Sequence, residues 1–337
     1  MAQLLIVSSV TAFAQPGPDV IDQAREAWVK RDKPRLSKLR EQAVKEQHPL
    51  AMWADYWDIG LRLSEMRQAD LDAFYTRWAG TYVEDRLRND WLLELGHRRD
   101  WQSFAHDFPR FRMNDDREVT CYALLTDHLS GKDVLEPALK NWNAQRDADE
   151  GCNLLASTLL DAKIIGPADV LNKLRLSVEG GRLRAARQSA NLIDENGAER
   201  INAFWDKPKA YFDKKASKKS SSLGSSDTLT PAVLAALALS RLAASDVDEA
   251  TKQMNARWSR QLPQEWANWT WMQLGRQAAF KLDDKANSHF AHGFKGNKSK
   301  DKNNFAISDD TWAWMARSAL RGANGEGQWS RVQDAIH

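Results

Sequence analysis

Two glutamates are the side chains whose type best suits acid–base chemistry. Glu94 and Glu195 could each act as a general acid, a role a glutamate takes when its surroundings raise its pKa. Each is better explained as a solvent-facing helix residue or as a partner of a helix dipole. We therefore predict no catalytic residue in this chain.

Histidine is the next candidate, as a metal ligand. His289 and His292 are three residues apart and would share one face of a helix. With no acidic or cysteine partner in sequence reach, a solvated pair beside a basic loop is the better interpretation. The sequence also has no Gly-x-x-x-x-Gly-Lys-Ser/Thr loop, no His-Glu-x-x-His and no Gly-x-Ser-x-Gly elbow. We predict no metal site and no cofactor.

Tryptophan is unusually abundant, with 15 residues in the chain. Trp53 and Trp57 are four residues apart, and Trp266 and Trp269 are three residues apart. Such spacing places each pair on a single helix face, which predicts core packing between stacked helices.

Two further tryptophan pairs are spaced differently. Trp269 with Trp271, and Trp312 with Trp314, are two residues apart, so each pair points to two faces of its helix. We favour packing of the second ring against the next helix. The alternative is that these four residues form an exposed aromatic platform for a sugar or a partner.

Glycines recur in a pattern that indicates how the helices are arranged. Gly60, Gly96, Gly131 and Gly166 follow one another at intervals of about 35 residues, the size of one helix–turn–helix unit of an α-solenoid. Strand-forming residues are scarce, whereas Ala, Leu, Arg, Gln and Glu are common. We predict an all-α superhelix of irregular, tetratricopeptide-like repeats.

The first residues resemble an export signal. An apolar stretch ends in Ala12-Phe13-Ala14, the small-x-small pattern of a signal-peptidase site, although the basic start of such signals is missing. We predict a trimmed signal peptide over 1–14, with a frayed hydrophobic N-terminus as the alternative. Cys121 and Cys152 lie about one repeat apart, so in an exported protein we predict a disulfide rather than two buried thiols.

The overall composition limits the classes of function. The chain has 337 residues and 48 Lys and Arg against 46 Asp and Glu, a net charge of +2. This balance argues against a nucleic-acid partner, because dedicated binders carry a basic face. Beyond the N-terminal signal, no stretch has the roughly 20 apolar residues of a stable membrane span. We predict one α-superhelical domain over 15–337, with flexible basic loops at about 207–230 and 293–305.

Local sequence adds a family resemblance. The segment 90–101 reads Asp-Trp-Leu-Leu-Glu-Leu-Gly-His-Arg-Arg-Asp-Trp, and 115–118 reads Asp-Asp-Arg-Glu in a turn between helices. Together with the exported start, the Trp-rich helical pairs and the two cysteines, these segments resemble the N-terminal superhelical region of the large soluble lytic murein transglycosylases. The resemblance covers the whole mature chain and is closest over 20–200.

The resemblance implies a periplasmic enzyme of cell-wall turnover. Such enzymes cleave the MurNAc–GlcNAc β-1,4 bond of peptidoglycan without water and leave a 1,6-anhydro-MurNAc end. Their superhelix holds the glycan, while a lysozyme-like C-terminal domain carries one catalytic Glu in a Glu-Ser motif, followed by Gly-Leu-Met-Gln and Ala-Tyr-Asn-Ala-Gly. None of these motifs occurs in this sequence, so we expect that the catalytic domain is absent and that the chain alone is inactive.

The expected partners are therefore peptidoglycan glycan strands, together with periplasmic cell-wall proteins. Two other functions remain open at this point. One is a tetratricopeptide-like periplasmic adaptor that recognises proteins through its concave face. The other is a cytoplasmic helical-repeat scaffold, which requires that the N-terminal segment be retained.

Overall fold

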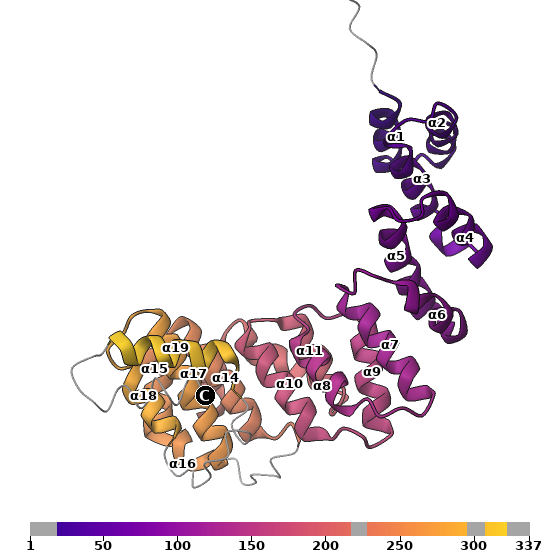
Figure 1. Cartoon of the computed structure of the whole chain (residues 1–337). Coiled ribbons are helices and arrows are strands. Elements are labelled where there is room, and N and C mark those ends of the chain that lie inside the picture. The colour runs from indigo at the N-terminus through magenta and orange to yellow at the C-terminus, as the bar shows by residue number, and fades with distance from the viewer. Residues whose placement is uncertain (1–18, 217–227, 295–306, 322–337) are drawn as a thin grey trace, which may run out of the picture. The chain divides into compact units, whose positions relative to one another are not determined.

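The computed structural model describes residues 19–216, 228–294 and 307–321. Within these ranges the chain contains helices, turns and loops and no strand, so the predicted all-α fold is confirmed (Figure 1). The predicted signal peptide lies outside the described residues. The chain divides into two compact units, Met1–Val119 and Thr120–His337, which we call unit 1 and unit 2.

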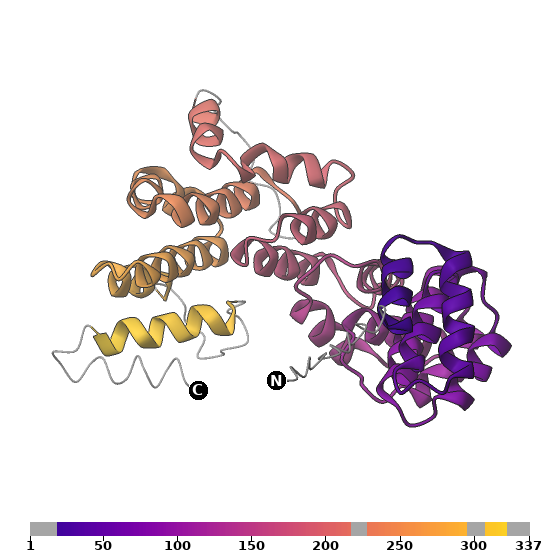
Figure 2. The same ribbon diagram turned by 90° about the horizontal axis from the view of Figure 1, so that it is seen from above.

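Unit 1 is built from short helices that pack on their neighbours in sequence. These helices are α1 (Val20–Val29), α2 (Lys33–Lys45), α3 (Ala51–Gly60), α4 (Gln68–Arg77), α5 (Tyr82–Arg98) and α6 (Trp101–Asp107), with single 3-10 turns η1 (Leu63–Glu65) and η2 (Phe108–Arg110). The first three pack against one another, and α5 packs on α3 and α6. Figure 2 draws the helices of unit 1, in indigo and purple, as one compact group.

Unit 2 contains the remaining helices, of which α7 begins just before the boundary. They are α7 (Arg117–Leu129), α8 (Leu135–Ala144), α9 (Glu150–Asp161), α10 (Pro167–Glu179), α11 (Leu183–Asn191), α12 (Gly197–Trp205), α13 (Pro208–Ala216), α14 (Pro231–Ser245), α15 (Val247–Gln253), the π-helical turn η3 (Met254–Trp258), α16 (Ser259–Gln261), α17 (Gln264–Phe280), α18 (Ala286–Gly293) and α19 (Asp309–Arg321).

Helix starts in unit 1 follow from capping residues in the sequence. The Asp19 carboxylate accepts a hydrogen bond from the backbone N of Ile21 at 2.7 Å, and Asp32 accepts from Arg35 N at 3.1 Å. Each cap satisfies a backbone donor that the first turn leaves unpaired. The apolar face of α1 then recurs at helical spacing, including Ala24 and Ala27, which are fully buried against α2 and α3.

The core of unit 2 is centred on α14. Its Thr230 hydroxyl accepts from Val233 N at 3.2 Å, and Pro231 occupies the first helical position. The helix is buried almost all round because α10, α12, α13, α15 and α17 surround it. A close contact between α17 and α18 depends on Gly275, where a Cβ atom would lie 2.7 Å from the Phe290 ring.

The four glycines that suggested a repeat do not occupy equivalent positions. Gly60 ends α3, whereas Gly96 lies inside α5. Gly131 has a φ of +86° after α7, and Gly166 precedes α10. At the end of α5 the left-handed turn is made by Arg99, with a φ of 58°. The interval of about 35 residues therefore indicated helical pairs correctly without marking one conserved turn.

The predicted flexible loop at 207–230 is wrong in its first part. Pro208–Ala216 forms α13, and Tyr211 and Phe212 of that helix are buried in the core of unit 2. Burial of these two aromatic side chains stabilises a helix in this segment, although its composition is charged. The central part of that loop, and nearly all of the one predicted at 293–305, lie outside the described residues.

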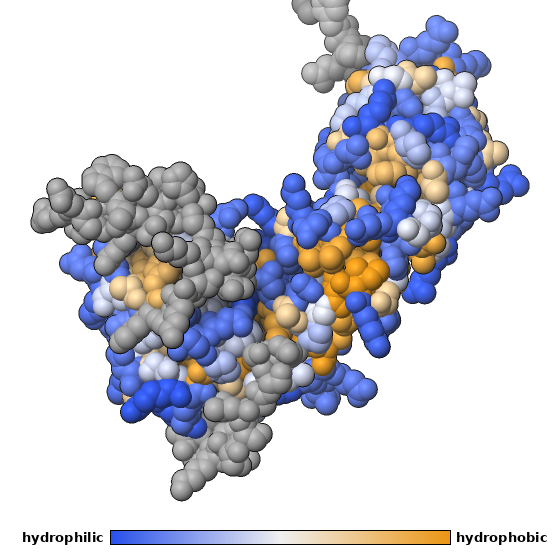
Figure 3. All heavy atoms as spheres, turned by 60° about the horizontal axis from the view of Figure 1, so that its bottom comes forward, coloured by the Kyte–Doolittle hydropathy of each residue, from blue (hydrophilic) through white to orange (hydrophobic). Residues whose placement is uncertain are grey.

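The described helices are all too short or too polar to cross a membrane. On the face drawn in Figure 3, hydrophilic residues cover most of the surface and apolar residues gather in separate patches.

Candidate functional site

The two cysteines are joined as predicted. Cys121 of α7 and Cys152 of α9 form a disulfide, and both residues are fully buried. The amide nitrogen of Asn141 on α8 lies 2.9 Å from Cys121 Sγ and 3.9 Å from Cys152 Sγ. The bond therefore ties together helices at the start of unit 2.

The predicted alternative of an exposed tryptophan platform is wrong for its first two members. Trp269 is 2% exposed and Trp271 is 6% exposed, because α17 is surrounded by other helices. Trp312 and Trp314 on α19 are half-buried and pack against the small core formed by α17, α18 and α19. Core packing of Trp266 with Trp269 is confirmed, with edge-to-face rings whose centroids are 5.7 Å apart.

The other predicted candidates stay apart from one another. Glu94 pairs with Arg98 one turn along α5, at 2.7 Å, and Glu195 is exposed. His289 is buried and stacks on the Trp271 ring at 5.6 Å, so the predicted solvated histidine pair is wrong for this residue. Across the described ranges, no three His, Cys, Asp or Glu side chains come together in a way that could hold a metal ion.

Burial of His289 should make unit 2 sensitive to acid. Burial lowers the pKa of this imidazole from 6.5, so the native state binds fewer protons than the unfolded state. Stability should therefore fall as the pH drops below 6.5 through the native pKa. We expect the melting temperature of His289→Phe, which keeps a ring on Trp271, to fall less steeply than that of the wild type over this range. Equal slopes would exclude His289 as the cause.

Unit 1 carries a continuous strip of aromatic rings that sequence analysis missed. We call Trp28, Trp57, Trp53 and Tyr82 the aromatic strip. Successive ring centroids lie 5.6 Å, 6.2 Å and 6.1 Å apart, and successive planes differ by 15°, 35° and 42°. The rings thus follow one another from α1 across α3 to the start of α5.

The ends of the aromatic strip are open to solvent. Trp28 is 38% exposed and Tyr82 is 59% exposed, whereas Trp53 and Trp57 between them are half-buried. Of the two middle residues, only Trp57 packs against the apolar core of α1, α2 and α3. The prediction that Trp53 and Trp57 are ordinary core residues is therefore only partly right.

Local sequence explains why the end rings leave the core. Trp28 directly follows Ala27, the last buried residue of α1, so it points about 100° away from the buried face. Tyr82 is the first residue of α5, whereas its buried face begins at Val83 and continues at Leu87. The sequence signal that could have identified these exposed rings is thus an aromatic residue one position away from the apolar face of its helix.

A groove of about 340 Å³ continues from the Tyr82 end of the strip. It is lined by Gly80, Thr81, Tyr82, Asp85, Arg112 and Met113. The Asp85 carboxylate forms one wall by accepting hydrogen bonds from the backbone N of Arg112 at 3.0 Å and of Met113 at 2.7 Å. These bonds fix the segment after η2 against the start of α5.

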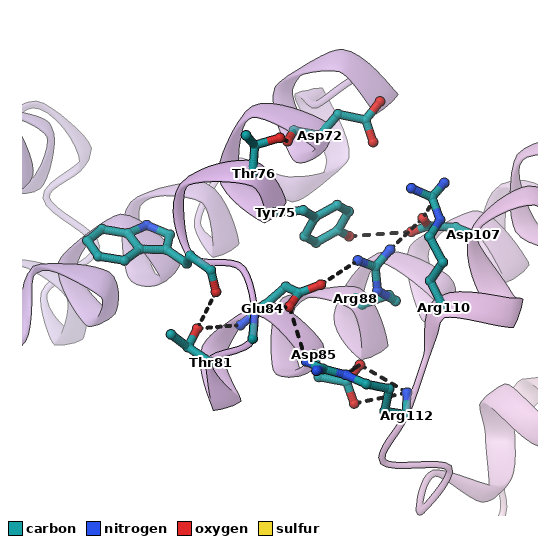
Figure 4. Close-up of polar contacts among 12 residues, drawn as sticks. Asp72, Tyr75, Thr76, Thr81, Glu84, Asp85, Arg88, Asp107, Arg110 and Arg112 are labelled. Atoms are coloured by element: carbon teal, nitrogen blue, oxygen red, sulfur yellow. Dashed lines mark hydrogen bonds and ion pairs between the residues drawn. The ribbon is translucent and has the colours of Figure 1, made fainter.

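A buried ionic network holds the helices behind this groove (Figure 4). Arg88 of α5 donates to Asp107 at 2.6 Å and to Glu84 at 2.9 Å. Its guanidinium also lies 3.9 Å from the centre of the Tyr75 ring, whose hydroxyl donates to Asp107 at 3.4 Å. Burial raises the pKa of Asp107. The network joins α4, α5 and α6.

A second buried carboxylate fixes α3, which contributes two rings to the strip. Asp55 is fully buried and accepts from Arg40 at 2.7 Å, from Arg77 at 2.5 Å and from Trp78 Nε1 at 2.8 Å. A carboxylate buried in this way is stable only when its oxygens are fully paired. The sequence contained no periodic signal for these partners because they come from two other segments, α2 and the end of α4.

Polar groups border the aromatic strip beside Trp53. The Tyr56 ring packs edge-on against Trp53 at 5.9 Å, and its hydroxyl donates to Asp90 at 2.6 Å. Burial and this hydrogen bond raise the pKa of Tyr56 to about 12, so the hydroxyl stays protonated. Aromatic faces beside polar groups suit a ligand that has both apolar C–H faces and hydroxyl groups, as sugars do.

Comparison with solved structures identifies the fold. The lytic transglycosylase Slt of Pseudomonas aeruginosa, solved as an inactive mutant, matches with a TM-score of 0.52 and 18% identity, over 94% of this chain and 55% of that one. The chain has the all-α superhelical fold of soluble lytic transglycosylases. No protein-family model and no curated protein sequence matches it.

Two further structures show the same fold. Slt70 of Escherichia coli matches with a TM-score of 0.50 and 15% identity, over 94% of this chain and 54% of that chain. A 70 kDa soluble lytic transglycosylase in complex with bulgecin A matches with a TM-score of 0.50 and 16% identity, over 94% of this chain and 48% of that chain. The chain thus spans about half the length of the enzymes that it resembles.

Proposed function

We propose that this chain is the superhelical, peptidoglycan-binding scaffold of a periplasmic lytic transglycosylase. The observation that carries the proposal is the aromatic strip of unit 1, a series of exposed and half-buried rings bordered by polar groups. Sugar rings present C–H faces to such platforms and hydroxyl groups to their edges. The superhelical fold shared with lytic transglycosylases supports peptidoglycan as the source of the sugar.

The Cys121–Cys152 disulfide supports a periplasmic location, since disulfides persist in oxidising compartments. In this proposal the chain holds the glycan, and the enzyme cleaves MurNAc–GlcNAc β-1,4 bonds without water to give 1,6-anhydro-MurNAc. We assign binding, and not cleavage, to this chain itself, since its sequence contains none of the Glu-Ser, Gly-Leu-Met-Gln and Ala-Tyr-Asn-Ala-Gly motifs.

Trp53→Ala tests the binding role directly. Trp53 contacts both Trp57 and Tyr82, so its loss interrupts the strip at its centre. We expect binding to purified murein sacculi to weaken roughly 30-fold, the effect of losing a central aromatic anchor worth about 2 kcal/mol. Co-sedimentation over a range of sacculus concentrations measures the change.

The matched control is Trp314→Ala, which removes a half-buried tryptophan with an aromatic neighbour in unit 2. It should bind sacculi as the wild type does. Wild-type affinity in Trp53→Ala, or an equal loss in both variants, would count against the strip. Release of anhydro-muropeptides in the same tubes would contradict a purely binding role, and capture of envelope proteins without sacculi would favour the adaptor function.

A further inference from the structure

The Tyr82 end of the aromatic strip differs chemically from the rest of it. Tyr82 is the most exposed ring of the strip and also lines the groove. Arg86 lies one turn further along α5, and Arg112 lines the same groove as Tyr82. Two guanidinium groups therefore accompany the last ring, whereas Trp57, further along the strip, packs against Trp28 and the apolar core of α1, α2 and α3.

Both guanidinium groups keep donors that the protein does not use. Arg112 donates from Nη2 to Glu84 at 3.1 Å, and its Nε lies 3.7 Å from Asp85. Arg86 donates from Nε to the Tyr56 hydroxyl at 3.4 Å, and its Nη2 lies 3.8 Å from Asp90. Within the described ranges neither Nη1 makes a hydrogen bond or ion pair, and the two side chains are 55% and 44% exposed.

The acidic groups nearby are already engaged. Asp85 is buried, and its carboxylate accepts from two backbone N–H groups. Asp90 accepts from the Tyr56 hydroxyl, and Glu84 accepts from Arg88 and from the backbone N of Gly80. In the part of the chain that the structure describes, the two arginine Nη1 atoms remain open to a ligand at this end, beside an exposed tyrosine ring.

We propose that the Tyr82 end of the strip binds a carboxylate carried by a sugar, so that the site selects acidic glycans over neutral ones. The inference rests on the proposed glycan-binding function and specifies its ligand class. A guanidinium group pairs with a carboxylate through short, charge-assisted hydrogen bonds, which neutral hydroxyl or amide groups match less strongly. A muramyl residue whose lactyl carboxylate carries no peptide has the required chemistry.

The test compares two forms of one ligand by titration calorimetry with the full chain. The probes are a GlcNAc–MurNAc tetrasaccharide and the same tetrasaccharide with its carboxylates converted to amides. We expect the acidic form to bind the wild type about tenfold more tightly, the value of one charge-assisted hydrogen bond over a neutral one. In Arg112→Gln this preference should disappear while the amidated form binds unchanged, and Arg86→Gln should reduce it.

Arg67→Gln is the control, because Arg67 is an 85% exposed arginine of unit 1 that lines neither strip nor groove. It should keep the tenfold preference and so exclude a general effect of net charge. Equal binding of both ligands by the wild type would overturn acidic selection and leave glycan binding intact. Failure of the wild type to bind either probe or sacculi would overturn the proposed function itself.

Discussion

Arg88→Met should destabilise unit 1 by about 3–5 kcal/mol, the cost of leaving a buried charge without its partner. Arg88 is 2% exposed and Asp107 is fully buried, and they are joined at 2.6 Å. Arg110 lies 3.3 Å from the same carboxylate, but it is 44% exposed and replaces the lost partner incompletely. Native-state hydrogen exchange of the α5 and α6 amides measures the loss where it occurs.

Two comparisons separate this effect from ordinary loss of an ion pair. Lys30→Met breaks the Glu26–Lys30 pair, whose side chains are 48% and 63% exposed, and should cost less than about 1 kcal/mol. Arg88→Met combined with Asp107→Leu should recover much of the lost stability, because an apolar pair needs no counterion. A double variant as unstable as Arg88→Met would show that packing, and not charge, dominates.

The pH dependence of Arg88→Met has a defined sign. Burial raises the native pKa of Asp107 above 3.8, so the native state holds this proton more tightly than the unfolded state. Stability then falls as the pH rises from 3.8 through the native pKa, and losing Arg88 raises that pKa further. The deficit of the variant should therefore shrink at acidic pH.

The second large effect concerns the disulfide. The double variant Cys121→Ala and Cys152→Ala should lose roughly 3–4 kcal/mol, because the bond closes a loop of 31 residues and restricts the unfolded chain. Unit 2 should consequently unfold at lower denaturant concentration, with α7 and α9 exchanging their amide protons first. Wild-type protein that has been unfolded and refolded with reductant should have the same unfolding midpoint as the variant. The midpoint of the variant itself should not change with reductant. Equal midpoints for wild type and variant would contradict the prediction.

The helices are the part of this protein that sequence alone determined. Capping residues such as Thr230 with Pro231, and apolar spacing such as Ala24 and Ala27, act within one or two turns. They therefore predict helix positions without knowledge of the fold. The same local logic failed at Pro208–Ala216, where burial of Tyr211 and Phe212 against distant helices overrides a charged composition.

The disulfide and the absence of catalytic motifs were also accessible from sequence, because they depend on residue type and spacing. The location of the exposed aromatics was not. Four of the 15 tryptophans were assigned to an alternative platform, yet Trp269 and Trp271 are buried. Helical spacing predicts which residues share a face of a helix. Whether that face is exposed to solvent depends on how many other helices pack around it.

Sequence by itself thus determined an all-α chain of short helical pairs with one disulfide. Only the tertiary structure brought Trp28, Trp53, Trp57 and Tyr82 into one strip, because they come from three helices. These helices are joined by contacts between distant segments, such as the hydrogen bond from Tyr56 of α3 to Asp90 of α5. Interactions between segments far apart in the chain produce no periodic pattern in the sequence. The aromatic surface and its flanking arginines are for that reason a property of the fold.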